Sequence, residues 1–289
     1  TKYFLTQAAA SAMILFASTT NAWQTGTWDI TNLTSPHSHI MLTLALAMKL
    51  GLAPTHFWLP EVLQGTTMAT ALLIITWQKL APLTLIYLTI NNLSTTVLFT
   101  LGLLSSIIGG WGGLNQTQIR KVMAYSSIAH LGWMITISSV MTSIMIFNLM
   151  IYLIMTTSLF LSLMLSKSKT VQDTTTIWTI SPTMATMMML LLLSLGGLPP
   201  LTGFTPKWMI LEELIAQNLI PMATIMMLST LLSLFFYLRL TYTTALTLSP
   251  NTIYTKLKWR FKSHSPTLLT LTLSTASILL LPIMPLMML

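Results

Sequence analysis

Three lysines lie in the middle of long apolar stretches of this 289-residue chain: Lys49, Lys79 and Lys207. A lysine at the centre of a bilayer costs about 2.5–3.5 kcal/mol on the insertion scale, so such residues are rare and mark ion or proton pathways. At 1.5 Å per helical residue, Lys49 and Lys79 lie about 17 and 20 Å from the starts of their helices, close to the midplane. The three lysines therefore predict a proton relay inside a membrane. The alternative is that each ammonium reaches the surface along its alkyl chain or pairs with a neighbouring acid.

His130 is the fourth candidate for proton transfer, because it lies deep in the apolar stretch 118–140. An imidazole accepts and releases protons near neutral pH with little driving force. A histidine that only hydrogen-bonds a neighbouring helix would explain the same position equally well. No acid is expected at this depth, because Glu61 lies toward one surface and Glu212 and Glu213 lie toward the other. The predicted positive charges therefore lack an evident counter-charge.

Residues that interrupt helices lie close to each of the three lysines. They are Gly51 and Pro54 near Lys49, Pro82 near Lys79, and Pro199, Pro200, Gly203 and Pro206 near Lys207. Proline removes a backbone donor and frees a carbonyl one turn back, and inside a bilayer such groups need protein or water as partners. The segments 51–54 and 197–200 repeat one pattern, Gly-Leu-Ala-Pro and Gly-Leu-Pro-Pro. Paired breaks of this kind are typical of transporters built from two related halves.

The elements that must position these residues are membrane helices. Hydrophobic residues make up 54% of the chain and charged residues only 6%, against roughly 25% in a soluble domain. This composition excludes a soluble enzyme, and the absence of cysteine excludes a disulfide-stapled secreted scaffold. The apolar runs predict an all-α, polytopic membrane protein with about nine helices, two of them broken, in a single domain over residues 1–289. The predicted helices are 1–20, 38–64 (broken), 66–88, 91–112, 118–140, 143–165, 183–217 (broken), 221–243 and 267–286.

Basic residues are concentrated in the loops on one side of the predicted membrane domain. If each broken helix counts as one crossing, the loops alternate between side B, which holds the N-terminus, and side A. Side B receives ten of the thirteen basic residues: Lys2, Arg120, Lys121, Lys167, Lys169, Arg239, Lys256, Lys258, Arg260 and Lys262. The loops of side A carry only the acids Asp29, Glu212 and Glu213. We therefore expect side B to face the compartment in which the chain was made.

Two segments invite other interpretations. The run Lys256–Lys262 alternates basic with other, partly aromatic residues, as a nucleic-acid site does. After a membrane helix such a run indicates anchoring to anionic lipid, for example cardiolipin, and we expect no nucleic-acid partner. Lys2 followed by an apolar stretch resembles a signal peptide. The polar residues Thr6, Gln7 and Ser11 instead favour an internal helix of a chain cut at its N-terminus.

Three segments resemble the antiporter-like membrane subunits of respiratory complex I. Residues 49–61 read Lys-Leu-Gly-Leu-Ala-Pro-Thr-His-Phe-Trp-Leu-Pro-Glu and resemble the family signature K-x-G-x-x-P-x-H-x-W-L-P-(D/E). Residues 126–132 and 197–208 resemble two further family segments. The small size and the Met- and Thr-rich, cysteine-free composition are similar to the members encoded in animal mitochondrial DNA.

The resemblance implies an antiporter-like fold and a proton-pumping role in NADH:ubiquinone oxidoreductase of the inner mitochondrial membrane. By this resemblance Lys49 and Lys207 match the lysines of the two broken helices, and Lys79 matches the central bridging lysine. Other membrane subunits of complex I would be partners, and side B would face the matrix. NAD, FMN, iron–sulfur clusters and ubiquinone would be handled by other subunits and none would bind this chain. The family also places a glutamate on a helix before the stretch present here, so we expect roughly two helices of the family to be missing.

Two other functions remain open on the sequence alone. A stand-alone cation/proton antiporter would carry the same motifs and would exchange ions without redox subunits. A structural spacer in a larger assembly would contain the lysines merely as paired charges.

Overall fold

The computed structural model describes residues 1–31, 33, 35–247 and 267–279, and these form an all-α structure. Its helices are α1 (Lys2–Thr25), α2 (Pro36–Leu50), α3 (Trp58–Gly65), α4 (Met68–Ile75), α5 (Trp77–Thr89), η1 (Ile90–Asn92), α6 (Thr95–Gly112), α7 (Ile119–Ser138), α8 (Thr142–Ser166), η2 (Gln172–Thr176), α9 (Ile177–Ile180), α10 (Pro182–Gly196), α11 (Phe204–Ala216), α12 (Ile220–Leu246) and α13 (Thr267–Leu279). Within these residues no strand forms, and one isolated bridge joins Gln118 and Thr170. The predicted all-α class is confirmed.

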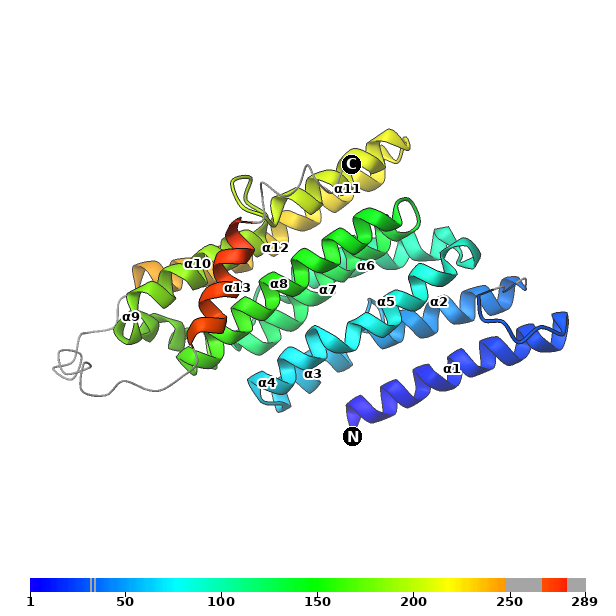
Figure 1. Ribbon diagram of the computed structural model, residues 1–289, viewed down its shortest axis with the longest axis horizontal. Helices are drawn as coiled ribbons and strands as arrows, with labels where there is room; N and C mark the ends of the chain where they lie inside the picture. The colour runs from blue at the N-terminus through cyan, green and yellow to red at the C-terminus, as the bar shows by residue number, and fades with distance from the viewer. Residues whose placement is uncertain (32, 34, 248–266, 280–289) are drawn as a thin grey trace.

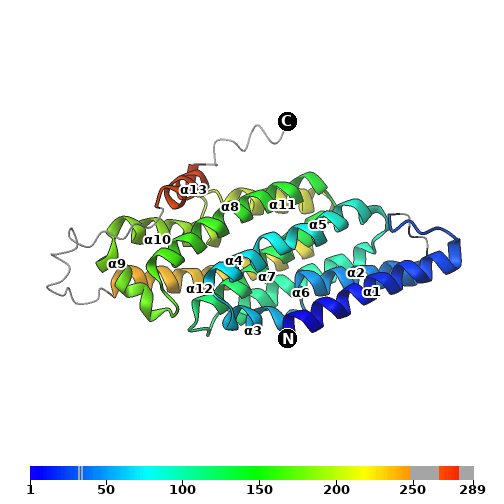
Figure 2. The same cartoon turned by 60° about the horizontal axis from the view of Figure 1, so that its bottom comes forward.

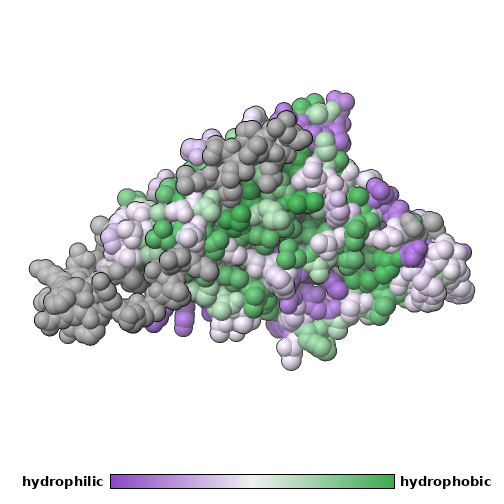
Figure 3. Space-filling model, viewed as in Figure 1, coloured by the Kyte–Doolittle hydropathy of each residue, from purple (hydrophilic) through white to green (hydrophobic). Residues whose placement is uncertain are grey.

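The described part of the chain contains several long apolar helices. Four stretches are long and apolar enough to cross a membrane: Met68–Asn92, Thr95–Gly112, Thr142–Ser166 and Ile220–Leu246. Their outward faces carry large apolar side chains, and Leu228 and Leu231 of α12 are 64% and 61% exposed. Figure 3 shows extensive apolar surface along the flank of the molecule. Such a surface fits lipid and not water, so the chain is a multi-pass membrane protein.

Both predicted helix breaks are present. The stretch predicted over 38–64 is α2 and α3, and the stretch predicted over 183–217 is α10 and α11. Each first half ends at a glycine in the left-handed conformation, Gly51 with φ 78° and Gly197 with φ 82°. Glycine adopts this conformation without the steric penalty of a Cβ, which is why each first half stops there.

The predicted continuous helix over 66–88 is wrong in one respect, because it is divided into α4 and α5 at Thr76. Thr76 has φ −107° and ψ −71°, and its hydroxyl donates to the Leu72 carbonyl at 2.7 Å. A threonine that bonds back to the preceding turn bends a helix. The bend lies three residues before Lys79 and so helps to set the direction of that side chain.

Helix α7 is the centre of the bundle (Figures 1 and 2). It is buried along almost its whole length and packs against α3, α4, α6, α8, α11 and α12. The approach to α6 is close, because a Cβ on Gly109 would lie 2.5 Å from the Ala129 backbone nitrogen. Small residues let membrane helices approach in this way. The central helix, which carries His130, is therefore held from several sides.

Three basic residues, Lys2, Arg120 and Arg239, lie at helix ends that meet at one end of the bundle. Lys2 forms an ion pair with Glu61, and Arg120 donates to the Thr66 carbonyl. Arg239 donates to the carbonyls of Leu114 and Gln116. These contacts join the N-terminus and the turns that the crossing count assigns to side B. The run Lys256–Lys262 lies outside the described residues.

Candidate functional site

Lys79 is a buried lysine whose hydrogen-bond partner is an aromatic side chain of another helix. It lies on α5, is 4% exposed, and donates from Nζ to the Tyr152 hydroxyl at 3.4 Å. The same nitrogen is 5.4 Å from the centroid of the Tyr152 ring. Tyr152 comes from α8, which packs against α4 and α7. The ammonium therefore lies at the hydroxyl end of this tyrosine.

His130 packs against the same tyrosine. It is 8% exposed, and its ring centroid is 5.3 Å from that of Tyr152 with an interplanar angle of 42°. The charges of Lys79 and Lys207 are both close enough to act on it. The structure thus brings together Lys79 and His130, which the sequence proposed separately, and places Tyr152 in contact with both.

Lys207 occupies the second helix break. Its Nζ donates to the carbonyls of Gly196 and Leu195, at 3.0 and 3.5 Å, which lie at the end of α10. A helix end of this kind leaves carbonyls without intrahelical partners and carries partial negative charge. The ammonium on α11 satisfies both needs. The sequence expectation of freed carbonyls beside Lys207 is confirmed in this form.

The first break is closed differently. There the indole Nε1 of Trp58 donates to the Met48 carbonyl at 3.2 Å. Lys49 lies one residue farther along α2, is partly buried, and accepts a hydrogen bond at its backbone oxygen from Gln7. Among the described residues its ammonium makes no hydrogen bond or ion pair. The structure therefore leaves Lys49 outside the cluster formed by Lys79, Tyr152 and His130.

Two buried tyrosines were missed in the sequence analysis. Besides Tyr152, Tyr237 of α12 is 1% exposed and packs beside Gly196, the residue whose carbonyl accepts from Lys207. Both tyrosines are polar residues inside long apolar runs, and a tyrosine in such a place normally finds a hydrogen-bond partner. The sequence feature that could have identified them is their position inside apolar runs.

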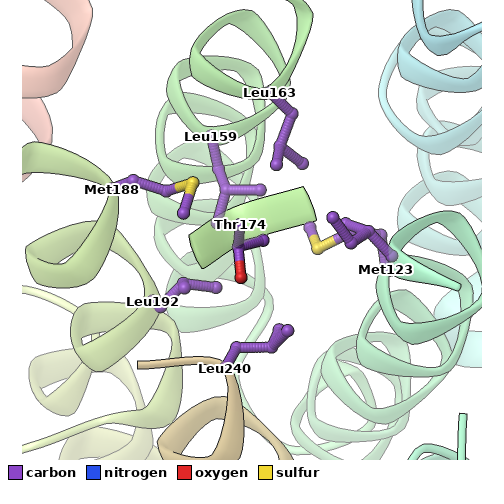
Figure 4. A pocket seen from close by; sticks show the side chains of 8 residues that line it. Met123, Leu159, Leu163, Thr174, Met188, Leu192 and Leu240 are labelled. Carbon is purple, nitrogen blue, oxygen red and sulfur yellow. The ribbon is translucent and has the colours of Figure 1, made fainter. Parts of the chain in front are cut away.

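Acidic side chains and cavities lie away from this cluster. Glu61 pairs with Lys2 at side B, while Glu212 and Glu213 line a groove beside Met141 at side A. Figure 4 shows a separate apolar cavity of about 10 Å³, in which Thr174 is the one polar lining residue. A cavity of this size and composition is too poor in polar partners to hold a water molecule. It contributes packing only.

Comparison with known proteins identifies the family. Residues 1–233 match the family model described as NADH:quinone oxidoreductase/Mrp antiporter, TM, and residues 234–288 match NADH dehydrogenase subunit 2 C-terminus. NADH-ubiquinone oxidoreductase chain 2 of Xenopus laevis is 56% identical over 99% of this chain and 83% of its own length. The chain 2 protein of Varanus timorensis is 57% identical over the same shares. This chain belongs to the NADH-ubiquinone oxidoreductase chain 2 family. The resemblance found in the three sequence segments is confirmed.

Two solved structures share the fold of this chain. A chain of respiratory complex I from Thermus thermophilus with bound aureothin is 24% identical, with a TM-score of 0.79 over 97% of this chain and 67% of that chain. A chain of the membrane-bound sulfane sulfur reductase, an archaeal respiratory membrane complex, is 16% identical, with a TM-score of 0.84 over 99% and 63%. Both belong to multi-subunit membrane assemblies. The predicted antiporter-like fold is confirmed.

Proposed function

We propose that this chain is a proton-translocating membrane subunit of NADH:ubiquinone oxidoreductase, and that Lys79, His130 and Lys207 carry protons through its interior. The observation that carries the proposal is the buried contact of Lys79 with Tyr152, against which the tilted ring of His130 packs. Charged groups of this kind inside a membrane domain mark proton pathways. Lys79 acts as the central relay and Lys207 as the site nearer the exit. Lys49 acts as the switchable uptake site, on the motif 49–61.

The surroundings of the lysines support a relay more than a spacer. A spacer would require each ammonium to be paired with an acid. Lys79 instead has a neutral tyrosine as its partner, and Lys207 has backbone carbonyls. Neutral partners let a proton leave without stranding a buried carboxylate.

The proposal extends to the setting of the chain. Membership of the chain 2 family supports the inner mitochondrial membrane as its location, other membrane subunits of complex I as partners, and NAD, FMN, iron–sulfur clusters and ubiquinone as groups held by other subunits. Side B faces the matrix, in agreement with the positive-inside rule. Cardiolipin at Lys256–Lys262 stays a prediction outside the described residues. Residues 1–289 act as one membrane domain, since α12 runs through the boundary between the two family matches.

Replacement of the central lysine tests the proposal. In an assembled complex, Lys79→Met is expected to lower the ratio of protons pumped to electrons transferred while NADH oxidation continues. Proton pumping is measured by fluorescence quenching in proteoliposomes, together with NADH consumption. Lys169→Met, at an exposed lysine of side B, is the matched control and keeps the wild-type ratio. An unchanged ratio in Lys79→Met would refute the assignment.

A stand-alone cation/proton antiporter remains the second candidate, because the family matched over residues 1–233 includes Mrp antiporters. It predicts cation-driven proton exchange by the purified chain alone in liposomes. Constant co-purification with redox subunits, and no exchange without them, would exclude this candidate.

A further inference from the structure

Tyr152 occupies a junction between three helices. Its side chain extends from α8, is 2% exposed, and contacts Lys79 of α5 and His130 of α7. Its hydroxyl is also within hydrogen-bonding reach of Ser127, one turn before His130 on α7. One buried aromatic side chain therefore touches both proton-carrying residues.

The chemistry of tyrosine suits a buried ammonium. The hydroxyl oxygen offers lone pairs to Nζ of Lys79. At 3.4 Å from that oxygen and 5.4 Å from the ring centroid, Nζ lies beyond the hydroxyl end of the ring. A hydrogen bond from a charged donor is worth more than one between neutral groups. Tyr152 thus favours an ammonium over a neutral amine at this point.

The other titratable groups around Lys79 do not supply this attraction. His130 faces it from α7, and the helices packed nearby add Lys207 of α11, Tyr237 of α12 and Lys49 of α2. The lysines, and His130 when protonated, repel a cation. The described carboxylates lie toward the two surfaces: Asp29, Glu61, Asp173, Glu212 and Glu213. Tyr152 is therefore the described group in direct contact that holds the Lys79 ammonium in place.

We propose that Tyr152 is a positioning residue for proton transfer between Lys79 and His130. Its hydroxyl fixes the ammonium and its ring fixes the imidazole, so that the two proton carriers keep a constant separation. This inference rests on the proposed proton relay. It adds to that relay a residue on α8 that carries no charge itself.

The test is the pH profile of proton pumping in the assembled complex carrying Tyr152→Phe. This variant keeps the ring and removes the hydroxyl. The alkaline limb, where Lys79 ceases to hold its proton, is expected to move to lower pH by about one unit, because losing a hydrogen bond to a charged group changes an equilibrium about tenfold. NADH oxidation with an uncoupler is expected to stay at the wild-type rate. Tyr87→Phe, on the same helix as Lys79 but 45% exposed, is the matched control with an unchanged profile.

A second variant keeps the test decisive if Tyr152→Phe does not assemble. Tyr152→Met removes the hydroxyl and fills the site with a flexible apolar side chain, so its alkaline limb is expected to show the same shift to lower pH. A wild-type profile in either variant overturns the inference. Lys79→Met separates this failure from that of the relay. If Lys79→Met abolishes pumping while Tyr152→Phe changes nothing, only the role of Tyr152 is refuted.

Discussion

Gly197 shows how a single residue can hold a charged side chain in place. It has φ 82°, and a Cβ added there would lie 2.8 Å from Nζ and 3.0 Å from Cδ of Lys207. The glycine therefore meets two requirements at once, a left-handed backbone and room for the ammonium that binds the end of α10.

Gly197→Ala is expected to destabilise the protein and to displace Lys207. The left-handed conformation alone costs about 1–2 kcal/mol for a residue with a Cβ. The displaced ammonium should lower the ratio of protons to electrons. Thermal unfolding of the assembled complex and proteoliposome pumping measure the two effects.

Gly26→Ala is the matched control for the backbone effect. Gly26 has φ 72°, but a Cβ there would meet nothing within 4 Å. Similar destabilisation with an unchanged pumping ratio is expected. If both variants pump like the wild type, Gly197 does not position Lys207.

The sequence predicts which charged residues form the site better than it predicts the contacts that they make. Lys79, Lys207 and His130 are conspicuous in sequence because charge or imidazole is costly in apolar runs. Tyr152 is not conspicuous in this way, because tyrosine is common in membrane helices and its hydroxyl needs only one partner. Its role depends on how α8 packs against α4 and α7, which the sequence does not specify.

At the scale of elements, the contact between α6 and α7 positions His130. Gly109→Ala would put a Cβ 2.5 Å from the backbone nitrogen of Ala129, the residue before His130. Overpacking of this kind costs about 1–3 kcal/mol. We expect a lower unfolding temperature of the complex and reduced pumping. Gly65→Ala, where a Cβ meets nothing within 4 Å, should leave both unchanged; equal effects of the two variants would contradict this account.

The loop before η2 is held by one carboxylate. Asp173 Oδ2 accepts from the backbone nitrogens of Thr170 and Lys169, at 2.8 and 2.9 Å. These two hydrogen bonds hold the pKa of Asp173 below its ordinary value. The stabilisation is therefore complete above the ordinary pKa and is lost as the pH falls through the lowered one.

Hydrogen exchange checks the pH dependence of this loop. The amides of Lys169 and Thr170 should be protected near neutral pH and open more below about pH 4, after correction for the intrinsic exchange rate. Asp173→Asn should weaken their protection at neutral pH and remove its dependence on acid. Protection that is equal in both proteins would show that the carboxylate does not hold the loop.

Helix positions could be predicted well, and helix interruptions only in part. The breaks at Gly51 and Gly197 follow from Gly-Pro patterns that cannot continue a helix. The bend at Thr76 has no such pattern, because threonine is common in these helices and its hydroxyl bonds back to the preceding turn without interrupting the helix elsewhere, as Thr156 does in α8.

At the scale of the whole molecule, the basic end and the acidic groove define two surfaces. The ion pair of Lys2 with Glu61 lies at side B, and Glu212 and Glu213 lie at side A. The chain contains no cysteine, so any cysteine introduced into it is a unique label site within this subunit. Labelling of such cysteines can therefore measure whether the two surfaces lie on opposite sides of the membrane.

Lys169→Cys and Gln217→Cys are expected to react with a membrane-impermeant maleimide from opposite sides. Both positions are exposed, at side B and side A respectively. In inner-membrane vesicles of known orientation, Lys169→Cys should be labelled from the matrix side only. Labelling of both variants from one side would contradict the crossing count.

The two helix breaks are closed by side chains of different charge. Trp58 closes the first break with a neutral indole, whose hydrogen bond to Met48 does not depend on protonation. Lys207 closes the second with an ammonium, whose attraction to the carbonyl end of α10 disappears with its charge. The closure of the first break is therefore independent of protonation, whereas the closure of the second weakens when Lys207 loses its proton. The loss of that proton would therefore loosen the junction between α10 and α11.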